Sequence, residues 1–320
     1  MDQRQRTGRF GFCVILFALV LRLAVEGVLL RGLEPLLQRD TTPIPIYSET
    51  GRTVRFSASL AHFRESPAPW VPKPEKPCFS GEEVSAADLY NTSGRQADVA
   101  ALLETPLDWD LTGGRPTVLI LHTHGTESYT PGDEPYTATS SYRTLEEDRN
   151  MLSIGDVVTE ILEENGIGVI HDREIYDYPS YNGAYVRARA AITDHLARNP
   201  SIRLVLDLHR DASGTIGKQL RTEAVVDGES AAQLMLVQGT NFDTWQENLS
   251  LGLKLQVLLE RKNPGIMRPL NLRSQRFNQD LNPGALLVEV GAAGNTRQEA
   301  LLAARELALA VVSLAEGTGS

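Results

Sequence analysis

The stretch TVLILHTHGTESY, residues 117–129, decides the expected fold of this chain. Its first five residues form a run that is typical of a buried strand. Two histidines and a glutamate, His122, His124 and Glu127, follow where this strand ends. Ligands and reacting groups collect beyond the carboxyl ends of strands in open parallel α/β sheets. The stretch therefore predicts a functional site at the edge of such a sheet.

Two further strand-like runs are associated with polar residues. Residues 202–208 lead directly into His209 and Arg210, and the apolar run 284–291 contains Glu289. A carboxylate among apolar residues is costly unless it is paired or has a function. The three runs together predict that side chains from different strands meet at one edge of the sheet.

The residue types at these strand ends match a zinc hydrolase. His124 and Glu127 are spaced as His-x-x-Glu, which lets one short loop present a nitrogen and an oxygen to the same zinc ion. We expect His209 to be the third ligand. Three protein ligands leave one position for water, and the remaining carboxylate, Glu289, is expected to accept the proton of that water.

From residue 116 onward, strand-like and helical patterns alternate. The expected strands are 117–121, 168–170, 202–208, 221–226, 233–238 and 285–290, and the expected helices are 149–165, 182–199, 244–262 and 296–315. Such alternation implies an α/β fold, with a mostly parallel sheet and helices on both faces. We expect this three-layer domain to span residues 116–318.

The N-terminus has the pattern of a targeting segment. Three arginines within the first nine residues precede an apolar run over residues 10–30, which Arg22 and Glu26 interrupt. A basic flank before an apolar core is typical of an export signal. Because no clean cleavage site follows, we favour an uncleaved signal anchor over residues 1–30. The positive-inside rule then predicts a single-pass protein of the cell membrane with its following domain outside the cytoplasm.

Residues 31–115 are expected to form a juxtamembrane region. Five prolines within residues 67–77 exclude a helix or a central strand there and indicate an extended, semi-rigid spacer. The sequence leaves open whether the segments 44–57 and 85–103 pack on the following domain.

Composition limits the class of function. The net charge of −10 argues against a nucleic-acid partner, because no basic surface is available. The two cysteines, Cys13 and Cys78, cannot form a disulfide framework and are not in a Cys-x-x-Cys motif. Thiolate ligands to zinc are therefore not expected.

Five blocks resemble those of the stage II sporulation protein P family. They are HTHGTESY (122–129), DRNMLSIGD (148–156), HDREIYDYPSYNGAY (171–185), LVLDLHRDA (204–212) and NLRSQRFNQDLNPGALLVEVGAAGNT (271–296). The family comprises membrane-anchored cell-wall hydrolases of endospore-forming bacteria and is similar to zinc-dependent N-acetylmuramoyl-L-alanine amidases. The resemblance implies an amidase-like domain with Zn²⁺ as cofactor and peptidoglycan as substrate.

The resemblance also implies a reaction and partners. The expected reaction is cleavage of the amide that joins the glycan to its stem peptide during engulfment, with peptide cross-links as a second target. The expected partners are stage II sporulation proteins D and M. A metal-free domain that binds peptidoglycan or a partner is the alternative from another functional class.

Two metal ligands have rivals. The related amidases place a ligand glutamate at the start of the helix that follows the first strand, and Glu147 stands at a similar helix start. We favour Glu127. His122 is the rival to His124, but it directly follows the strand and is expected to face a neighbouring residue.

Four polar residues are candidates for contacts with the substrate. Arg210 is expected to stabilise the oxyanion or to bind a substrate carboxylate, with a salt bridge to a neighbouring aspartate as the alternative. Arg273, Arg276 and Asn278 lie in a polar segment just before the run that contains Glu289. That position suits substrate binding, and a role in stabilising the loop is the alternative.

Overall fold

The computed structural model describes residues 79, 89–107, 110–131, 142–215 and 218–318. The expected anchor, residues 1–30, and the proline-rich spacer, residues 67–77, lie outside these ranges. Within them, no helix is both long enough and apolar enough to cross a membrane.

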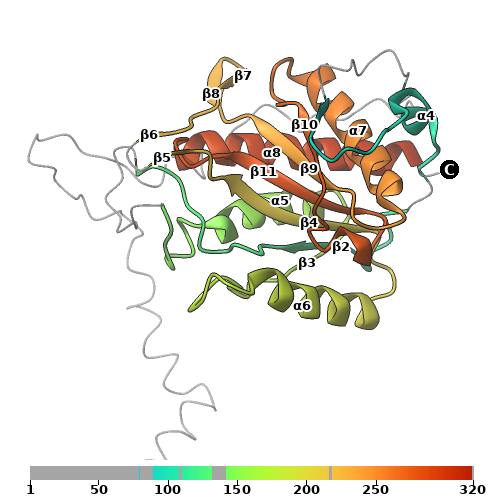
Figure 1. The fold of residues 1–320 in the computed structure, drawn as a ribbon, viewed down its shortest axis with the longest axis horizontal. Helices are drawn as coiled ribbons and strands as arrows, with labels where there is room; N and C mark the ends of the chain where they lie inside the picture. The colour runs from blue at the N-terminus through green and yellow to red at the C-terminus, as the bar shows by residue number, and fades with distance from the viewer. Residues whose placement is uncertain (1–78, 80–88, 108–109, 132–141, 216–217, 319–320) are drawn as a thin grey trace, which may run out of the picture. The chain divides into compact units, whose positions relative to one another are not determined.

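Seven strands of the described part form the central sheet, in the order β1-β10-β9-β11-β4-β2-β3 (Figure 1). Their bounds in that order are Leu89–Asn91, Leu270–Arg273, Leu234–Gly239, Ala285–Ala292, Leu204–Asp211, Pro116–Leu121 and Gly168–His171. Every neighbouring pair is parallel except β9 and β11, which are antiparallel. The expected mostly parallel sheet is confirmed.

The central strands are apolar because both faces of the sheet are covered. Residues of β2, β4 and β11 are almost all buried. Strands of parallel sheets that are covered on both sides have near-continuous apolar sequences. This explains why the runs 117–121, 202–208 and 285–290 could be recognised as strands.

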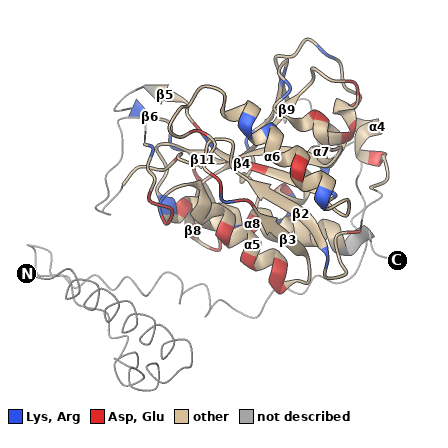
Figure 2. Ribbon diagram, turned by 90° about the horizontal axis from the view of Figure 1, so that it is seen from below, with Lys and Arg blue, Asp and Glu red and all other residues tan. Residues whose placement is uncertain are grey.

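The two faces are covered unequally. On one face, helix α8 (Arg297–Thr318) contacts both α5 (Met151–Glu164) and α7 (Trp245–Lys262). Helix α6 (Ala184–Arg198) lies on the other face (Figure 1) and packs against apolar residues of β2, β3 and β4. Helix α5 contains acidic residues and no Lys or Arg, whereas α6, α7 and α8 contain both signs (Figure 2). On the face that α6 covers, Phe277 packs against apolar residues of β9 and β11.

Side-chain caps fix where two of these helices begin. Asn150 accepts a hydrogen bond from the backbone N–H of Leu152 at the start of α5. At the start of α8, the side chain of Glu299 accepts from the N–H of Thr296, and the Thr296 hydroxyl accepts from the N–H of Glu299. This reciprocal pair is a capping box, and it satisfies two N–H groups that the helix leaves without partners.

Two elements that precede residue 116 pack on the elements that follow it. Strand β1 pairs with β10, and the short helix α4 (Val99–Glu104) packs on α7. On α7, Lys254 and Ser250 donate hydrogen bonds to the carbonyl of Leu102. Of the segment 85–103, which the sequence left open, the described residues from Leu89 onward therefore contribute an edge strand and a helix.

The expected strand 221–226 does not join the main sheet. Its last part, β7 (Ala224–Val226), pairs with β8 (Glu229–Ala231) in a separate hairpin. Asp227 and Gly228 between them both have positive φ. This turn geometry matches the twist of a tight hairpin, so the chain folds back locally. A second short pair, β5 (Gly214–Thr215) and β6 (Lys218–Gln219), also lies outside the main sheet.

Candidate metal centre and active site

Three strands bring the predicted site residues together. His124 and Glu127 follow β2, His209 lies near the end of β4, and Glu289 lies in β11. Glu289 and His209 are register partners in the parallel pair β4–β11. Register partners in neighbouring strands point to the same face of a sheet. The sheet therefore places Glu289 beside His209, on the face that α6 covers.

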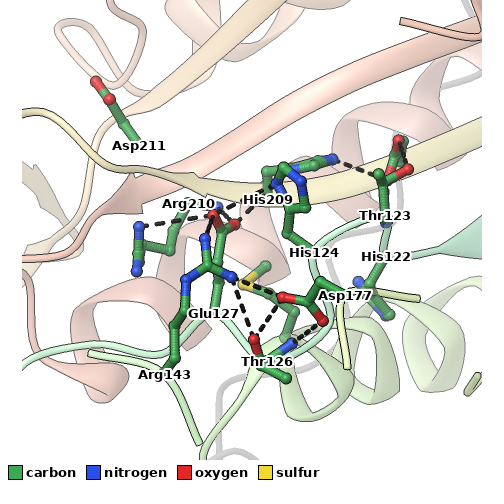
Figure 3. Close-up of polar contacts among 12 residues, drawn as sticks. His122, Thr123, His124, Thr126, Glu127, Arg143, Asp177, His209, Arg210 and Asp211 are labelled. Carbon is green, nitrogen blue, oxygen red and sulfur yellow. Dashed lines mark hydrogen bonds and ion pairs between the residues drawn. The ribbon is translucent and has the colours of Figure 1, made fainter. Parts of the chain in front are cut away.

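His124, Glu127 and His209 form a buried cluster with the spacing of a zinc site (Figure 3). One ligand atom from each lies within 4.8 Å of the others. Nδ1 of His124 is 3.7 Å from one Glu127 oxygen, and Nδ1 of His209 is 3.6 Å from the other. Tetrahedral zinc with ligands at about 2.1 Å separates ligand atoms by roughly 3.4 Å. The three residues therefore fit one zinc ion.

Burial and charge give two members of this cluster, His124 and Glu127, the protonation states that a metal site needs. Burial lowers the pKa of His124 to about 4, which leaves a lone pair available at neutral pH. Burial opposes ionisation of Glu127, but the charges of Arg210 and His209 hold its pKa well below the usual range. Glu127 is therefore a carboxylate, so His124 and Glu127 present one neutral and one anionic donor to a cation.

His209 lies between two carboxylates. Its Nδ1 faces Glu127, and its Nε2 is 3.0 Å from Oδ1 of Asp207. The contact with Asp207 is an ion pair, because its angles do not meet those of a hydrogen bond. Burial alone lowers the pKa of His209, but Asp207 and Glu127 raise it well above its usual value. Negative charge on both sides of one imidazole favours a cation there.

Asp207 is a functional candidate that the sequence reasoning did not single out. The backbone N–H and the hydroxyl of Thr123 donate to its two oxygens, at 2.8 and 2.6 Å. Carboxylates that contact a ligand histidine fix the orientation of its ring. The signal was present in the sequence, because Asp207 and His209 are two apart in one strand and share a face.

Two arginines hold the Glu127 carboxylate (Figure 3). Arg143 donates to Oε1 of Glu127 at 3.0 Å, and the backbone N–H of Arg210 donates to Oε2 at 3.2 Å. The Arg210 guanidinium is buried, donates to the carbonyl of Ser128 and has a nitrogen 3.7 Å from Glu127. Arg210 follows His209 directly and points to the opposite face. This geometry favours positioning of Glu127 over the contact with an oxyanion expected from the sequence.

Glu289 has the environment of an acid–base group. Its Oε2 atom is buried and has no hydrogen-bond partner in the described part of the chain. Burial raises the pKa of Glu289 to about 8, although the nearby His209 opposes that rise. A carboxyl group whose pKa is near neutrality suits general acid–base catalysis.

The two rival ligands lie elsewhere. His122 is buried on the other side of the sheet, with Nε2 2.9 Å from Nε2 of His171 and Nδ1 3.2 Å from the carbonyl of Leu208. Glu147 is exposed and pairs with Arg173 at 2.8 Å. Neither belongs to the cluster of His124, Glu127 and His209, so the geometry supports the ligands favoured from the sequence.

The three polar candidates before β11 have different surroundings. Asn278 is buried and donates to the carbonyl of Tyr185, so it joins its loop to α6. Arg276 lies 3.7 Å from Asp280. Arg273 lines a cavity next to Glu289. The structure thus favours loop stabilisation for Asn278 and keeps Arg273 as the candidate for substrate contact.

Two tyrosines complete the walls of the site and were not singled out from the sequence. The ring of Tyr181 stacks on His124 with centroids 4.6 Å apart, and Tyr185 lies near both His124 and His209. Both belong to the block 171–185 that carried the family resemblance. No chemical pattern in that block marks them, because tyrosine has no characteristic spacing in such sites.

A family model described as Stage II sporulation protein P (SpoIIP) matches residues 71–312 of the chain. The chain belongs to this family. A curated relative, Stage II sporulation protein P from Bacillus subtilis (strain 168), is 30% identical over 208 residues. That alignment covers 62% of this chain and 50% of the relative, so the chain spans about half the length of the relative it matches.

Solved structures with a similar arrangement include two amidases. An N-acetylmuramoyl-L-alanine amidase from Clostridium difficile 630 is 17% identical with a TM-score of 0.36, covering 62% of this chain and 94% of that one. The CwlD amidase from Clostridioides difficile, in complex with the GerS lipoprotein, is 15% identical with a TM-score of 0.40. It covers 61% of this chain and 94% of its own.

Proposed function

We propose that this member of the SpoIIP family is a zinc-dependent peptidoglycan hydrolase. Its substrate is the N-acetylmuramoyl-L-alanine amide, with peptide cross-links as a second target. The observation that carries the proposal is the buried cluster of His124, Glu127 and His209, with Glu289 beside it on the same sheet face. Membership of a sporulation family supports a role in remodelling the cell wall during sporulation.

The chain's own residues divide the work of amide hydrolysis. His124, Glu127 and His209 would hold the metal, and Arg143 and the backbone of Arg210 keep Glu127 in place. When bound, zinc supplies a Lewis acid that lowers the pKa of water toward about 7.

Glu289 is the group that moves protons in this proposal. It takes the proton from the attacking water and delivers it to the nitrogen of the leaving amine, so that the amide C–N bond breaks. Its Oε2 supports this role, because no group among the described residues forms a hydrogen bond with it.

The proposal places the enzyme at the cell membrane, with residues 1–30 as a single-pass anchor and the catalytic domain outside the cytoplasm. Stage II sporulation proteins D and M are the proposed partners. This placement rests on the sequence pattern of the N-terminus and on the family resemblance.

The test combines metal analysis with product analysis. Full-length protein purified in detergent is expected to contain one zinc per chain and to release stem peptides from purified peptidoglycan, as identified by mass spectrometry. His124→Ala and His209→Ala are each expected to lose zinc and hydrolysis together. A wild-type protein that binds peptidoglycan but releases nothing would instead support the metal-free binding domain.

A further inference from the structure

A cavity of about 490 Å³ lies next to the active site, over strands β9, β10 and β11, and Tyr185 of α6 is in its lining. Its floor is apolar and consists of Met235 and Val237 from β9 and Leu287 from β11, with Phe277 packed against them. Glu289 is in its wall. Cavities of this size hold small ligands or short peptide segments.

The register of the sheet explains how polar groups reach this floor. Val237 is the register partner of Asn271 on β10 and of Leu287 on β11, so all three point to the same face. Arg273 is two residues after Asn271 in the same strand and therefore shares that face. Asn271 and Arg273 both line the cavity.

Two buried polar atoms in the lining have no hydrogen-bond partner in the part of the chain that the structure describes. Within the described residues, Oδ1 of Asn271 and Oε2 of Glu289 make no hydrogen bond. A buried acceptor without a partner costs about 1–3 kcal/mol. Two such atoms in the wall of one cavity indicate that a ligand with hydrogen-bond donors supplies their missing hydrogen bonds.

The charges around the cavity indicate the sign of that ligand. Arg268 is neutralised by Asp211 at 2.7 Å, and Arg276, outside the lining, lies 3.7 Å from Asp280. Arg273 is exposed and pairs with no carboxylate among the described residues. It is the cation in the lining that remains available to an anionic group.

The role of Glu289 fixes which part of the substrate lies here. In the proposed reaction Glu289 gives its proton to the leaving amine, so the group attached to that amine lies on the Glu289 side. For the amide between glycan and stem peptide, that group is the stem peptide, which is acidic. A short acidic peptide matches an apolar floor, an unpaired amide oxygen and an available arginine.

We propose that this cavity is the subsite for the stem peptide, with Asn271 accepting a backbone N–H and Arg273 binding a carboxylate of the peptide. The inference rests on the proposed function, because the hydrolytic role of Glu289 orients the substrate. It adds a specificity determinant that the metal centre alone does not supply.

The test is direct binding of the released product, which needs no turnover. The probes are a synthetic stem tetrapeptide with a free glutamate carboxylate and the same peptide with that carboxylate amidated. Wild-type full-length protein is expected to bind the acid about tenfold more tightly than the amide in calorimetry. Arg273→Gln is expected to remove that preference, and Asn271→Leu is expected to weaken the binding of both peptides.

Arg276→Gln is the matched control, because it removes an exposed arginine from the same segment that lies outside the lining. It is expected to keep the preference for the acid. Equal binding of the two peptides by the wild type, or equal effects of Arg273→Gln and Arg276→Gln, would overturn the subsite.

The binding test and the test of the proposed function can fail independently of each other. If the wild type releases no stem peptide from peptidoglycan but binds the acid through Arg273, the hydrolytic proposal fails and the peptide site remains. If release is normal but binding is independent of Arg273, the subsite fails alone.

Discussion

Asp207→Asn tests whether the carboxylate beside His209 supports metal binding. Asp207 is buried, and its Oδ1 lies 3.0 Å from Nε2 of His209. The substitution keeps the size of the side chain and one oxygen acceptor, so the N–H of Thr123 can retain its partner. What it removes is the negative charge that orients and polarises the imidazole.

The expected effect on zinc affinity is about 10–100-fold, the range found when such a supporting group of a ligand is removed. This corresponds to about 1.4–2.7 kcal/mol. The effect should be smaller than that of His209→Ala, because the ligand itself remains. The assay is competition for zinc with a chelator of known affinity, with a thermal melt of the metal-free protein beside it.

Asp177→Asn is the matched control. Asp177 is also buried and also accepts from the N–H and hydroxyl of a threonine, Thr126, but it contacts Arg143 and no candidate ligand. Both variants should lower the melting temperature, and only Asp207→Asn should lose most of its zinc affinity. A loss below about threefold in Asp207→Asn, or equal losses in both variants, would refute the reasoning.

Three further predictions concern glutamate residues. Glu127→Ala should lower zinc occupancy, measured by elemental analysis, whereas Glu147→Ala should retain it, because Glu147 is exposed and distant from the cluster; the reverse result would move the ligand to the helix start. Glu289→Gln should keep zinc yet lose on the order of 10²-fold or more in stem-peptide release, and wild-type release would remove Glu289 from the mechanism. Glu299→Gln should cost about 1–2 kcal/mol of stability at neutral pH, because it removes the charge that pairs with Arg221, although Gln can keep the capping box. Burial opposes ionisation of Glu299, but Arg221 and other donors lower its pKa to about 2 from 4.5. Its contribution is therefore present above about pH 4.5 and lost as pH falls through about 2, so the difference between the melting temperatures of variant and wild type should shrink over that interval.

The sequence determined the parts of the site that depend on a single strand. Apolar runs ending in polar residues located β2, β4 and β11, since strands covered on both faces must be apolar throughout. The spacing of His124 and Glu127, and the position of Glu289 within an apolar run, identified the residues that the fold brings together. Side chains alternate between the two faces of a strand, so the sequence of β4 also implied that Asp207 and His209, two residues apart, share a face.

Only the tertiary structure decided the relations between strands and loops. Strand β1 is three residues long, and its pairing with β10 depends on a partner about 180 residues away, which no local pattern encodes. The role of Arg210 depends on where the carbonyl of Ser128 lies.

The cavity beside Glu289 likewise depends on how β9, β10 and β11 pair and on where Tyr185 and Phe277 lie against them. Local sequence fixes which way a side chain points along its own strand. The register between strands, and which surface stays uncovered, follow from long-range packing of the whole domain.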